Sequence, residues 1–163
     1  VDPMRFWSVW TIQGLWVFFT ALCVLIVNTR AESAGPLGLL DGLGMTLWAL
    51  GLGIEVLADR QKSAFKSRPE SKGRWIDEGL WSRSQHPNYF GEILLWSGLA
   101  VVGAGVLEGG QWIGLLSPVF VATLLLRVSG VPMLRERAMK RWGDDPEYIA
   151  YLDRTRLLLP VRR

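Results

Sequence analysis

The run FWSVWTIQGLWVFFTALCVLIVN, from Phe6 to Asn28, contains 23 residues and no charged side chain. A helix that crosses the hydrocarbon core of a bilayer needs about 20 apolar residues. The run is too long for the apolar part of a signal peptide, and no small-residue cleavage site follows it. It therefore predicts a transmembrane helix and decides the class of fold.

Three more apolar runs follow in this chain of 163 residues, of which 50% are hydrophobic. Four such runs leave too little polar surface for a soluble helical bundle. We predict an all-α fold, a polytopic membrane helical bundle that forms one domain over residues 1–163. The expected spans lie near residues 6–28, 37–57, 91–107 and 109–127. Because the first residue is Val1 rather than Met, we expect the chain to be a fragment of a longer protein.

Basic residues gather in the loop 59–88 and in the tail, residues 128–163. Because Lys and Arg are enriched in loops on the cytoplasmic side, both segments are predicted to face the cytoplasm. The pattern of residues 132–142 and the residues after Pro146 predict short helices at the membrane interface. The loop contains Arg60, Lys62, Lys66, Arg68, Lys72, Arg74 and Arg83; the tail and its boundary contain Arg127, Arg135, Arg137, Lys140, Arg141, Arg154, Arg156, Arg162 and Arg163; Arg5 and Arg30 lie elsewhere.

The composition excludes several classes of site. The net charge is only +3, so it does not indicate a nucleic-acid partner. The chain has one cysteine, Cys23, and one histidine, which argues against an internal disulfide, a metal site and a Ser-His-Asp triad. Neither GxGxxG nor GxxxxGK[ST] occurs, so the common nucleotide-binding folds are not indicated.

The stretch GIEVLADRQKSAFK, residues 53–66, is the first candidate site. Glu55 and Asp59 are four residues apart and share one face of a helix, and Lys62 and Lys66 follow. Carboxylates can hold ribose hydroxyls, and the basic residues can hold phosphates. The alternative is a helix end whose long charged side chains reach the interface.

The stretch RSQHPNYFGE, residues 83–92, is the second. Pro87 disfavours a helix at His86, so a helix is expected to start near Asn88. Asn88 and Glu92 then lie on one face of that helix at the membrane boundary. His86 can bind a ligand, donate a proton or serve only to shape the turn.

The tail RERAMKRWGDDPEYIAYLDRTR, residues 135–156, is the third. It is interpreted either as a basic helix on anionic lipid headgroups or as a lid of Arg and Tyr side chains over a cofactor that carries phosphate. Asp144 or Asp145 is expected to cap a helix that starts at Pro146. Tyr148 and Tyr151 share a face of that helix.

Three stretches, EVLADRQKSAF (55–65), GLWSRSQHPNYFGEILLWSG (79–98) and RWGDDPEYIAYLDRTRLLLP (141–160), give the chain a resemblance to the C-terminal part of the steroid 5-alpha-reductase family, in particular its bacterial membrane branch. Sterol C14/C7 reductases and isoprenylcysteine carboxyl methyltransferase are related. Asn88 resembles the reductase motif, and Pro87 resembles the methyltransferase motif. Gln85 stands where these families have an arginine, and Glu55 where eukaryotic reductases tend to have an amide.

The resemblance implies an enzyme of the bacterial inner membrane that uses NADPH to reduce a C=C bond of a lipophilic, steroid- or isoprenoid-like substrate. The alternatives are an S-adenosylmethionine-dependent methyltransferase and a non-catalytic protein that binds membrane lipids. The reductases' substrate-polarising residues lie in earlier spans, so no catalytic residue is assigned. The expected cofactor-binding residues are Glu55, Asp59, Lys62, Lys66, His86, Asn88, Tyr89, Glu92, Arg135 and Tyr148, and no metal is expected.

Overall fold

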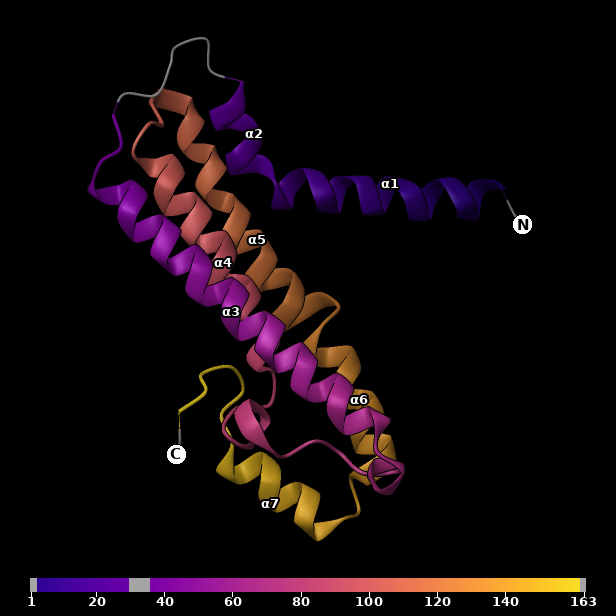
Figure 1. The fold of residues 1–163 in the computed structure, drawn as a ribbon. Coiled ribbons are helices and arrows are strands. Elements are labelled where there is room, and N and C mark those ends of the chain that lie inside the picture. The colour runs from indigo at the N-terminus through magenta and orange to yellow at the C-terminus, as the bar shows by residue number, and fades with distance from the viewer. Residues whose placement is uncertain (1–2, 30–35, 162–163) are drawn as a thin grey trace. The chain divides into compact units, whose positions relative to one another are not determined.

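The computed structural model describes residues 3–29 and 36–161, and within these ranges it is built of helices, without a strand (Figure 1). This confirms the predicted all-α class. The chain divides into two compact units. Unit 1 is Val1–Trp48 and Trp96–Ala122, and unit 2 is Ala49–Leu95 and Thr123–Arg163. Arg30, Arg162 and Arg163, which entered the argument on orientation, lie outside the described residues, as does the side chain of Arg5.

Unit 1 begins with α1 (Pro3–Thr20) and α2 (Leu22–Asn28), whose axes differ by 63°. The expected first span is therefore bent rather than straight. A 3₁₀ segment, η3 (Gly109–Leu115), and α5 (Leu116–Thr123) complete the unit together with parts of α3 and α4. Its core forms around buried Cys23, Ala100 and Leu107.

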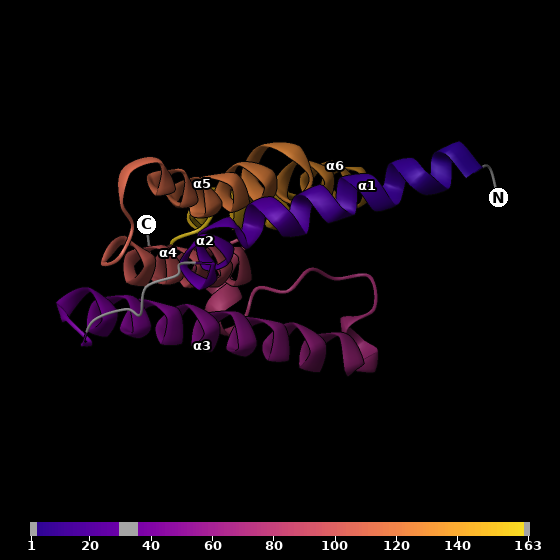
Figure 2. The ribbon, with the colours of Figure 1, turned by 90° about the horizontal axis from the view of Figure 1, so that it is seen from above.

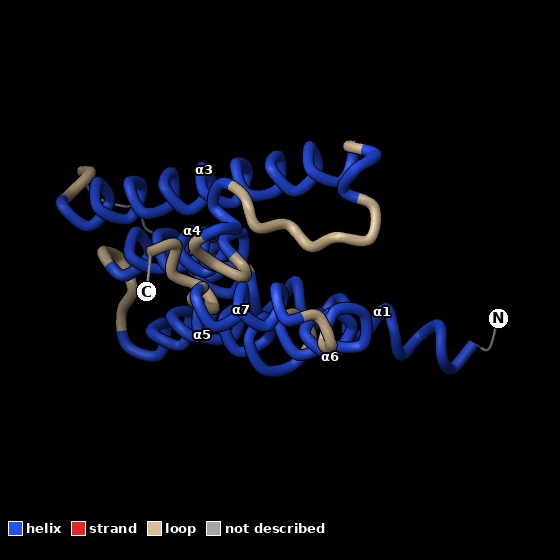
Figure 3. Tube along the Cα trace, turned by 90° about the horizontal axis from the view of Figure 1, so that it is seen from below, coloured by secondary structure: helices blue, strands red, loops and turns tan. Residues whose placement is uncertain are grey.

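Unit 2 contains most of the polar segments. The end of α3 (Leu39–Ser67) is followed by two 3₁₀ turns, η1 (Pro69–Ser71) and η2 (Gly79–Ser82), and then by α4 (Pro87–Ala104). A π-helical segment, η4 (Leu124–Val128), leads into α6 (Val131–Trp142) and α7 (Pro146–Arg154). The segment between α3 and α4 leaves the end of α3 and runs back beside its last turns (Figures 2 and 3).

Helix α3 is longer than the apolar run that predicted it. The expected span ended at residue 57 because charged residues follow, whereas the helix continues to Ser67. Asp59, Arg60 and Lys62 interrupt the apolar pattern, but most residues of this stretch, including Arg, Lys, Gln and Ala, are good helix formers. The loop predicted from residue 59 therefore begins about two turns later, and Asp59, Lys62 and Lys66 lie on a helix.

Within the described ranges, two helices are long and apolar enough to cross a membrane, namely Leu39–Ser67 and the helical stretch Gly109–Trp142. A third span results if α1 and α2 are taken as one bent segment. α4, expected to supply a further span, does not meet the same criterion because Asn88, Glu92 and other polar residues lie in its first two turns. The structure thus supports two or three candidate spans and does not confirm four.

Glycines let the backbones of α3 and α4 touch within unit 2. A methyl group added at Gly51 would lie 2.6 Å from the carbonyl oxygen of Gly91 and 2.5 Å from the backbone nitrogen of Leu95. One added at Gly91 would lie 2.7 Å from the nitrogen of Glu55. These are backbone atoms, which cannot move aside as the end of a side chain can, so the contact requires glycine in both helices.

We predict that Gly51→Ala lowers the free energy of unfolding by about 1–3 kcal/mol, because the added methyl group overpacks the contact between the helices. Gly53→Ala is the matched control, since a methyl group at Gly53 on the same helix meets nothing within 4 Å. Unfolding in lipid nanodiscs, followed by circular dichroism, measures both variants. Equal stability of the two variants would contradict the proposed role of the contact.

Candidate functional site

A pocket of about 330 Å³ lies within unit 2, between the last turns of α3, the segment that follows it, α6 and α7. We call it the cationic pocket, because six basic and six aromatic side chains line it and none of its lining residues, all within the described part of the chain, is acidic. The basic residues are Lys62, Lys66, Arg74, Arg135, Arg137 and Arg141; the aromatic ones are Phe65, Trp75, Trp81, Trp142, Tyr148 and Tyr151.

The basic residues form an exposed rim, with one exception. The five that are exposed are Lys66, Arg74, Arg135, Arg137 and Arg141, whereas Lys62 is partly buried with its Nζ 5.0 Å from the centre of the Trp81 ring. Like charges in one pocket repel one another, so an anionic ligand would relieve that repulsion. The electrostatics of the pocket therefore select for a polyanion.

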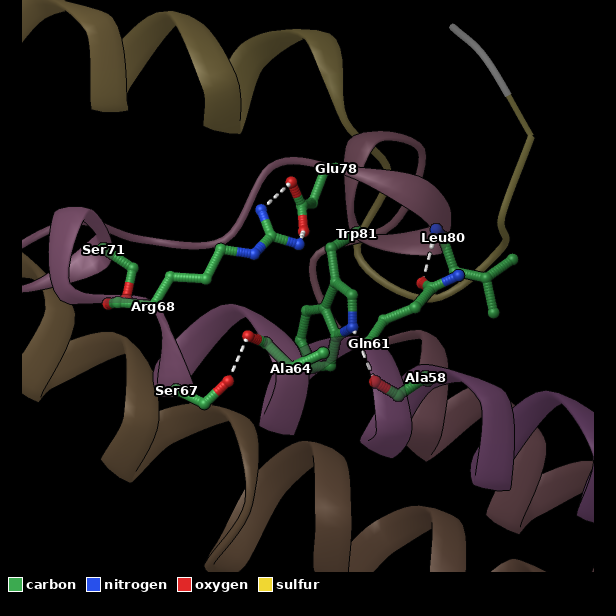
Figure 4. Close-up of polar contacts among 9 residues, drawn as sticks. All are labelled: Ala58, Gln61, Ala64, Ser67, Arg68, Ser71, Glu78, Leu80 and Trp81. Atoms are coloured by element: carbon green, nitrogen blue, oxygen red, sulfur yellow. Dashed lines mark hydrogen bonds and ion pairs between the residues drawn. The ribbon is translucent and has the colours of Figure 1, made fainter.

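Trp81 attaches the segment before α4 to helix α3 (Figure 4). Its buried indole Nε1 donates a hydrogen bond to the carbonyl oxygen of Ala58 at 3.0 Å. One turn along α3, the Oε1 of Gln61 accepts from the backbone nitrogen of Leu80 at 2.9 Å. Gly79 adopts a φ of +60°, and a Cβ atom at this position would collide with the side-chain amide of Gln61. These contacts hold one wall of the pocket.

Where the same segment leaves α3, the two terminal nitrogens of Arg68 donate to both carboxylate oxygens of Glu78 at 2.9 and 2.6 Å (Figure 4). The pair is exposed and contributes little stability by itself. Its two-point geometry does fix where the chain turns back toward the pocket.

Three aromatic rings join this segment to α6 and α7. Trp75 makes edge contacts with Trp142 and Tyr148, at centroid distances of 6.0 and 5.1 Å. The Nε1 of Trp142 donates to the carbonyl oxygen of Gly73 at 2.5 Å. Burial raises the pKa of the Tyr148 hydroxyl, so this ring is neutral at physiological pH. The pocket therefore offers flat, uncharged surfaces beside its basic rim.

The residues before α4 form hydrogen bonds with residues 155–158, which we call the C-terminal strap. The backbone nitrogens of Gln85 and His86 donate to the carbonyl oxygens of Arg156 and Leu157, at 2.8 and 3.1 Å. The hydroxyl of buried Ser84 donates to the carbonyl oxygen of Leu158 at 2.8 Å. These bonds position α7, whose Tyr151 hydroxyl donates to the carbonyl oxygen of Trp81 at 2.9 Å.

His86 lines the cationic pocket and stacks on Tyr89, with ring centroids 5.2 Å apart. Burial, together with the nearby positive charges of Lys62 and Arg135, lowers the pKa of His86 to about 4. The imidazole is therefore neutral at physiological pH and offers one acceptor and one donor nitrogen. It is a poor proton donor at neutral pH.

The predicted carboxylates form a second group, the acidic cluster, at the contact of α3 and α4. It consists of Glu55 and Asp59 on α3 and Glu92 on α4, whose charges lie close enough to interact. The Nδ2 of Asn88 donates to Asp59 Oδ1 at 3.2 Å, while its own Oδ1 is buried without a hydrogen-bond partner. A buried acceptor of this kind is costly unless a donor is supplied.

The structure thus divides the ten residues predicted to bind a cofactor. Five of them line the cationic pocket: Lys62, Lys66, His86, Arg135 and Tyr148. Four belong to the acidic cluster or bond to it, namely Glu55, Asp59, Asn88 and Glu92, and Tyr89 contacts the pocket through His86. Whether these residues bind a cofactor remains a prediction.

Several lining residues were missed by the sequence analysis. Arg137 and Arg141 belonged to the third candidate stretch but were not named among the ten binding residues, although their spacing of four residues places both on one face of α6. Trp75 and Trp81 were not among the candidate residues. Their burial beside basic residues depends on how the segment folds back, and no local pattern signals that.

Comparison with known proteins identifies a family but no solved structure. The family described as "Protein of unknown function (DUF1295)" matches residues 1–155. A segment of 66 residues, 40% of this chain, is 35% identical to the probable O-methyltransferase ustE of Ustilaginoidea virens, and it covers 23% of that protein. No solved structure matches the chain significantly.

His86 is the only histidine, so its titration can be followed without interference. We predict that its ¹³C-labelled ring titrates with a midpoint near pH 4 in the folded protein, measured by NMR in nanodiscs. Because the unfolded chain takes up this proton near pH 6.5, the free energy of unfolding should fall by up to about 3 kcal/mol between pH 6.5 and 4. His86→Gln should abolish that part of the pH dependence. A folded-state midpoint near 6.5 would contradict the burial of the ring against Lys62 and Arg135.

Proposed function

We propose that this chain, which belongs to the DUF1295 family, forms the cofactor-binding part of a membrane-embedded NADPH-dependent reductase. Its substrate would carry a C=C bond and be lipophilic, steroid- or isoprenoid-like. The observation that supports the proposal best is the cationic pocket, which combines basic and aromatic side chains without an acidic one. The resemblance to the steroid 5-alpha-reductase family adds independent support.

The donor set of the pocket fits the phosphates of NADPH. Arg74, Arg137 and Arg141 are exposed at the rim, where a water-soluble nucleotide would arrive. Arginine offers paired N–H groups in a plane, which suits phosphate oxygens. Lys62 and Lys66 add point charges from α3. A ligand with several phosphate charges would neutralise much of this repulsion.

The aromatic side chains fit the flat rings of the same cofactor. Trp75, Trp142 and Tyr148 are held in fixed mutual contact, so a heterocycle that stacks on them orders few side chains on binding. When bound, NADPH would supply a hydride to one carbon of the C=C bond, and the other carbon would take up a proton. The chain's own residues orient the nucleotide and exclude water from it.

The apolar helices provide the route for a lipophilic substrate. Leu39–Ser67 and Gly109–Trp142 are candidate membrane spans, and each carries pocket residues near its C-terminal end. We propose that α1 with α2 and α4 also cross the bilayer, which gives the four spans expected from the sequence. The basic loop and tail would then face the cytoplasm of a bacterial inner membrane.

A methyltransferase that uses S-adenosylmethionine is the second candidate. It is favoured by the 35% identity over 66 residues to the probable O-methyltransferase ustE, and by the sequence His86-Pro87-Asn88-Tyr89. The acidic cluster would suit the positive sulfonium and the ribose hydroxyls of that cofactor. The cationic pocket, in contrast, favours a polyanion, and for this reason NADPH remains our first choice.

We predict that Arg141→Ala weakens binding of NADP⁺ by about three- to tenfold, because one charge-assisted contact to phosphate is lost at a partly solvated site. Lys140→Ala is the control, since Lys140 is the neighbouring residue on α6, does not line the pocket and pairs with Glu136 at 2.6 Å. Calorimetry in nanodiscs at two salt concentrations should show the wild-type affinity falling with ionic strength. Equal effects of both variants would argue against phosphate binding in the pocket.

The same measurement distinguishes the two candidate cofactors. We expect NADP⁺ and NADPH to bind more tightly than S-adenosylmethionine. Tight binding of S-adenosylmethionine without binding of NADP⁺ or NADPH would reject the reductase. Transfer of a radiolabelled methyl group to a lipid or prenyl thiol would then identify the methyltransferase.

A further inference from the structure

Gln85 differs from the other polar residues that line the cationic pocket. Its Nε2 donates to the carbonyl oxygens of Leu152 and Thr155, at 3.1 and 3.2 Å, near the C-terminal end of α7. Both partners can only accept, so the NH₂ group of the amide must face them and the orientation of the amide is fixed. Within the described part of the chain, no donor bonds to its Oε1.

Gln85 lines the pocket, and its Oε1 is an acceptor on a residue whose neighbours in the lining are largely donors. The six basic side chains can only donate. The indole nitrogens of Trp81 and Trp142 also donate, and both are already bonded to backbone carbonyls. Next to Gln85, the neutral ring of His86 adds one acceptor nitrogen.

These two acceptor residues are less exposed than most of the basic ones. Gln85 and His86 are partly buried and belong to the segment that carries buried Trp81, whereas five of the basic residues are exposed. The pocket thus has an exposed basic rim and a less exposed part in which Gln85 and His86 are neutral beside Lys62. A ligand that matches both parts carries phosphates together with a ring that bears an N–H group.

We propose that Gln85 determines ligand specificity, its Oε1 accepting a hydrogen bond from an exocyclic N–H group on a ring of the bound nucleotide. This inference rests on the proposed function. NADP⁺ carries two such groups, the 6-amino group of adenine and the carboxamide NH₂ of nicotinamide. An arginine at this position would offer only donors, so the glutamine changes the kind of group that the pocket recognises.

Two analogues of NADP⁺ test the proposal without altering the protein. Nicotinamide hypoxanthine dinucleotide phosphate has an oxygen in place of the adenine amino group, and acetylpyridine adenine dinucleotide phosphate has a methyl group in place of the carboxamide NH₂. One of the two should bind wild-type protein about fivefold more weakly than NADP⁺, as expected for the loss of one hydrogen bond. The affected analogue identifies the ring that faces Gln85. Equal affinity of all three nucleotides would overturn the inference.

Gln85→Met removes the acceptor, and in this variant the difference between NADP⁺ and the weaker analogue should disappear. A difference that persists would place the recognition elsewhere and overturn the proposal. Ser84→Ala is the control, because it loses the bond to Leu158 and loosens the same strap but keeps the amide of Gln85. It should retain the discrimination even if its affinities fall, since a purely structural effect weakens all three nucleotides equally.

Failure of the inference can be told apart from failure of the proposed function. If wild-type protein binds NADP⁺ and both analogues equally, the reductase proposal stands and the role of Gln85 falls. If it binds none of the three nucleotides, the reductase proposal falls and the role of Gln85 with it.

Discussion

The contact between the backbones of α3 and α4 at Gly51 and Gly91 is the constraint on which unit 2 depends. It sets the distance between the two helices and thereby brings Asp59 within hydrogen-bond reach of Asn88. It also sets the position of the first turns of α4 beside α3. The residues just before α4 in turn bond to the C-terminal strap and so position α7. A bulkier residue at either glycine would therefore disturb both helix packing and the position of the candidate site.

In the part of α3 that belongs to unit 2, acidic side chains precede basic ones. Glu55 and Asp59 come first, and Lys62 and Lys66 follow within two turns, so the sign of the charge reverses toward the end of the helix. The acidic cluster and the cationic pocket are the result. Such an arrangement suits a ligand whose phosphates sit at one end and whose hydroxyl or positively charged groups sit at the other, as in an oxidised dinucleotide.

Short sequence patterns predicted the features that depend on residues close together in the sequence, such as helix starts and caps. Pro87 starts α4, Asp145 caps α7 by accepting from the nitrogen of Glu147, and Tyr148 and Tyr151 share the buried face of that helix. The extension of α3 and the bend between α1 and α2 were not predicted, because apolar run length indicates membrane crossing rather than helix limits. The pocket was predicted only in part, since its walls come from segments far apart in sequence.

Gln85 shows how one uncharged residue fits this electrostatic setting. Its NH₂ group satisfies two carbonyl oxygens near the end of α7, which an arginine could also do. An arginine would, however, add a seventh positive charge beside His86, whose pKa already lies near 4 because of burial, Lys62 and Arg135. The glutamine supports α7 without adding repulsion, and its Oε1 stays available as an acceptor. If Gln85 contacts the ligand as proposed, the departure from the resembling families changes the kind of group that is recognised and does not only remove an anion contact.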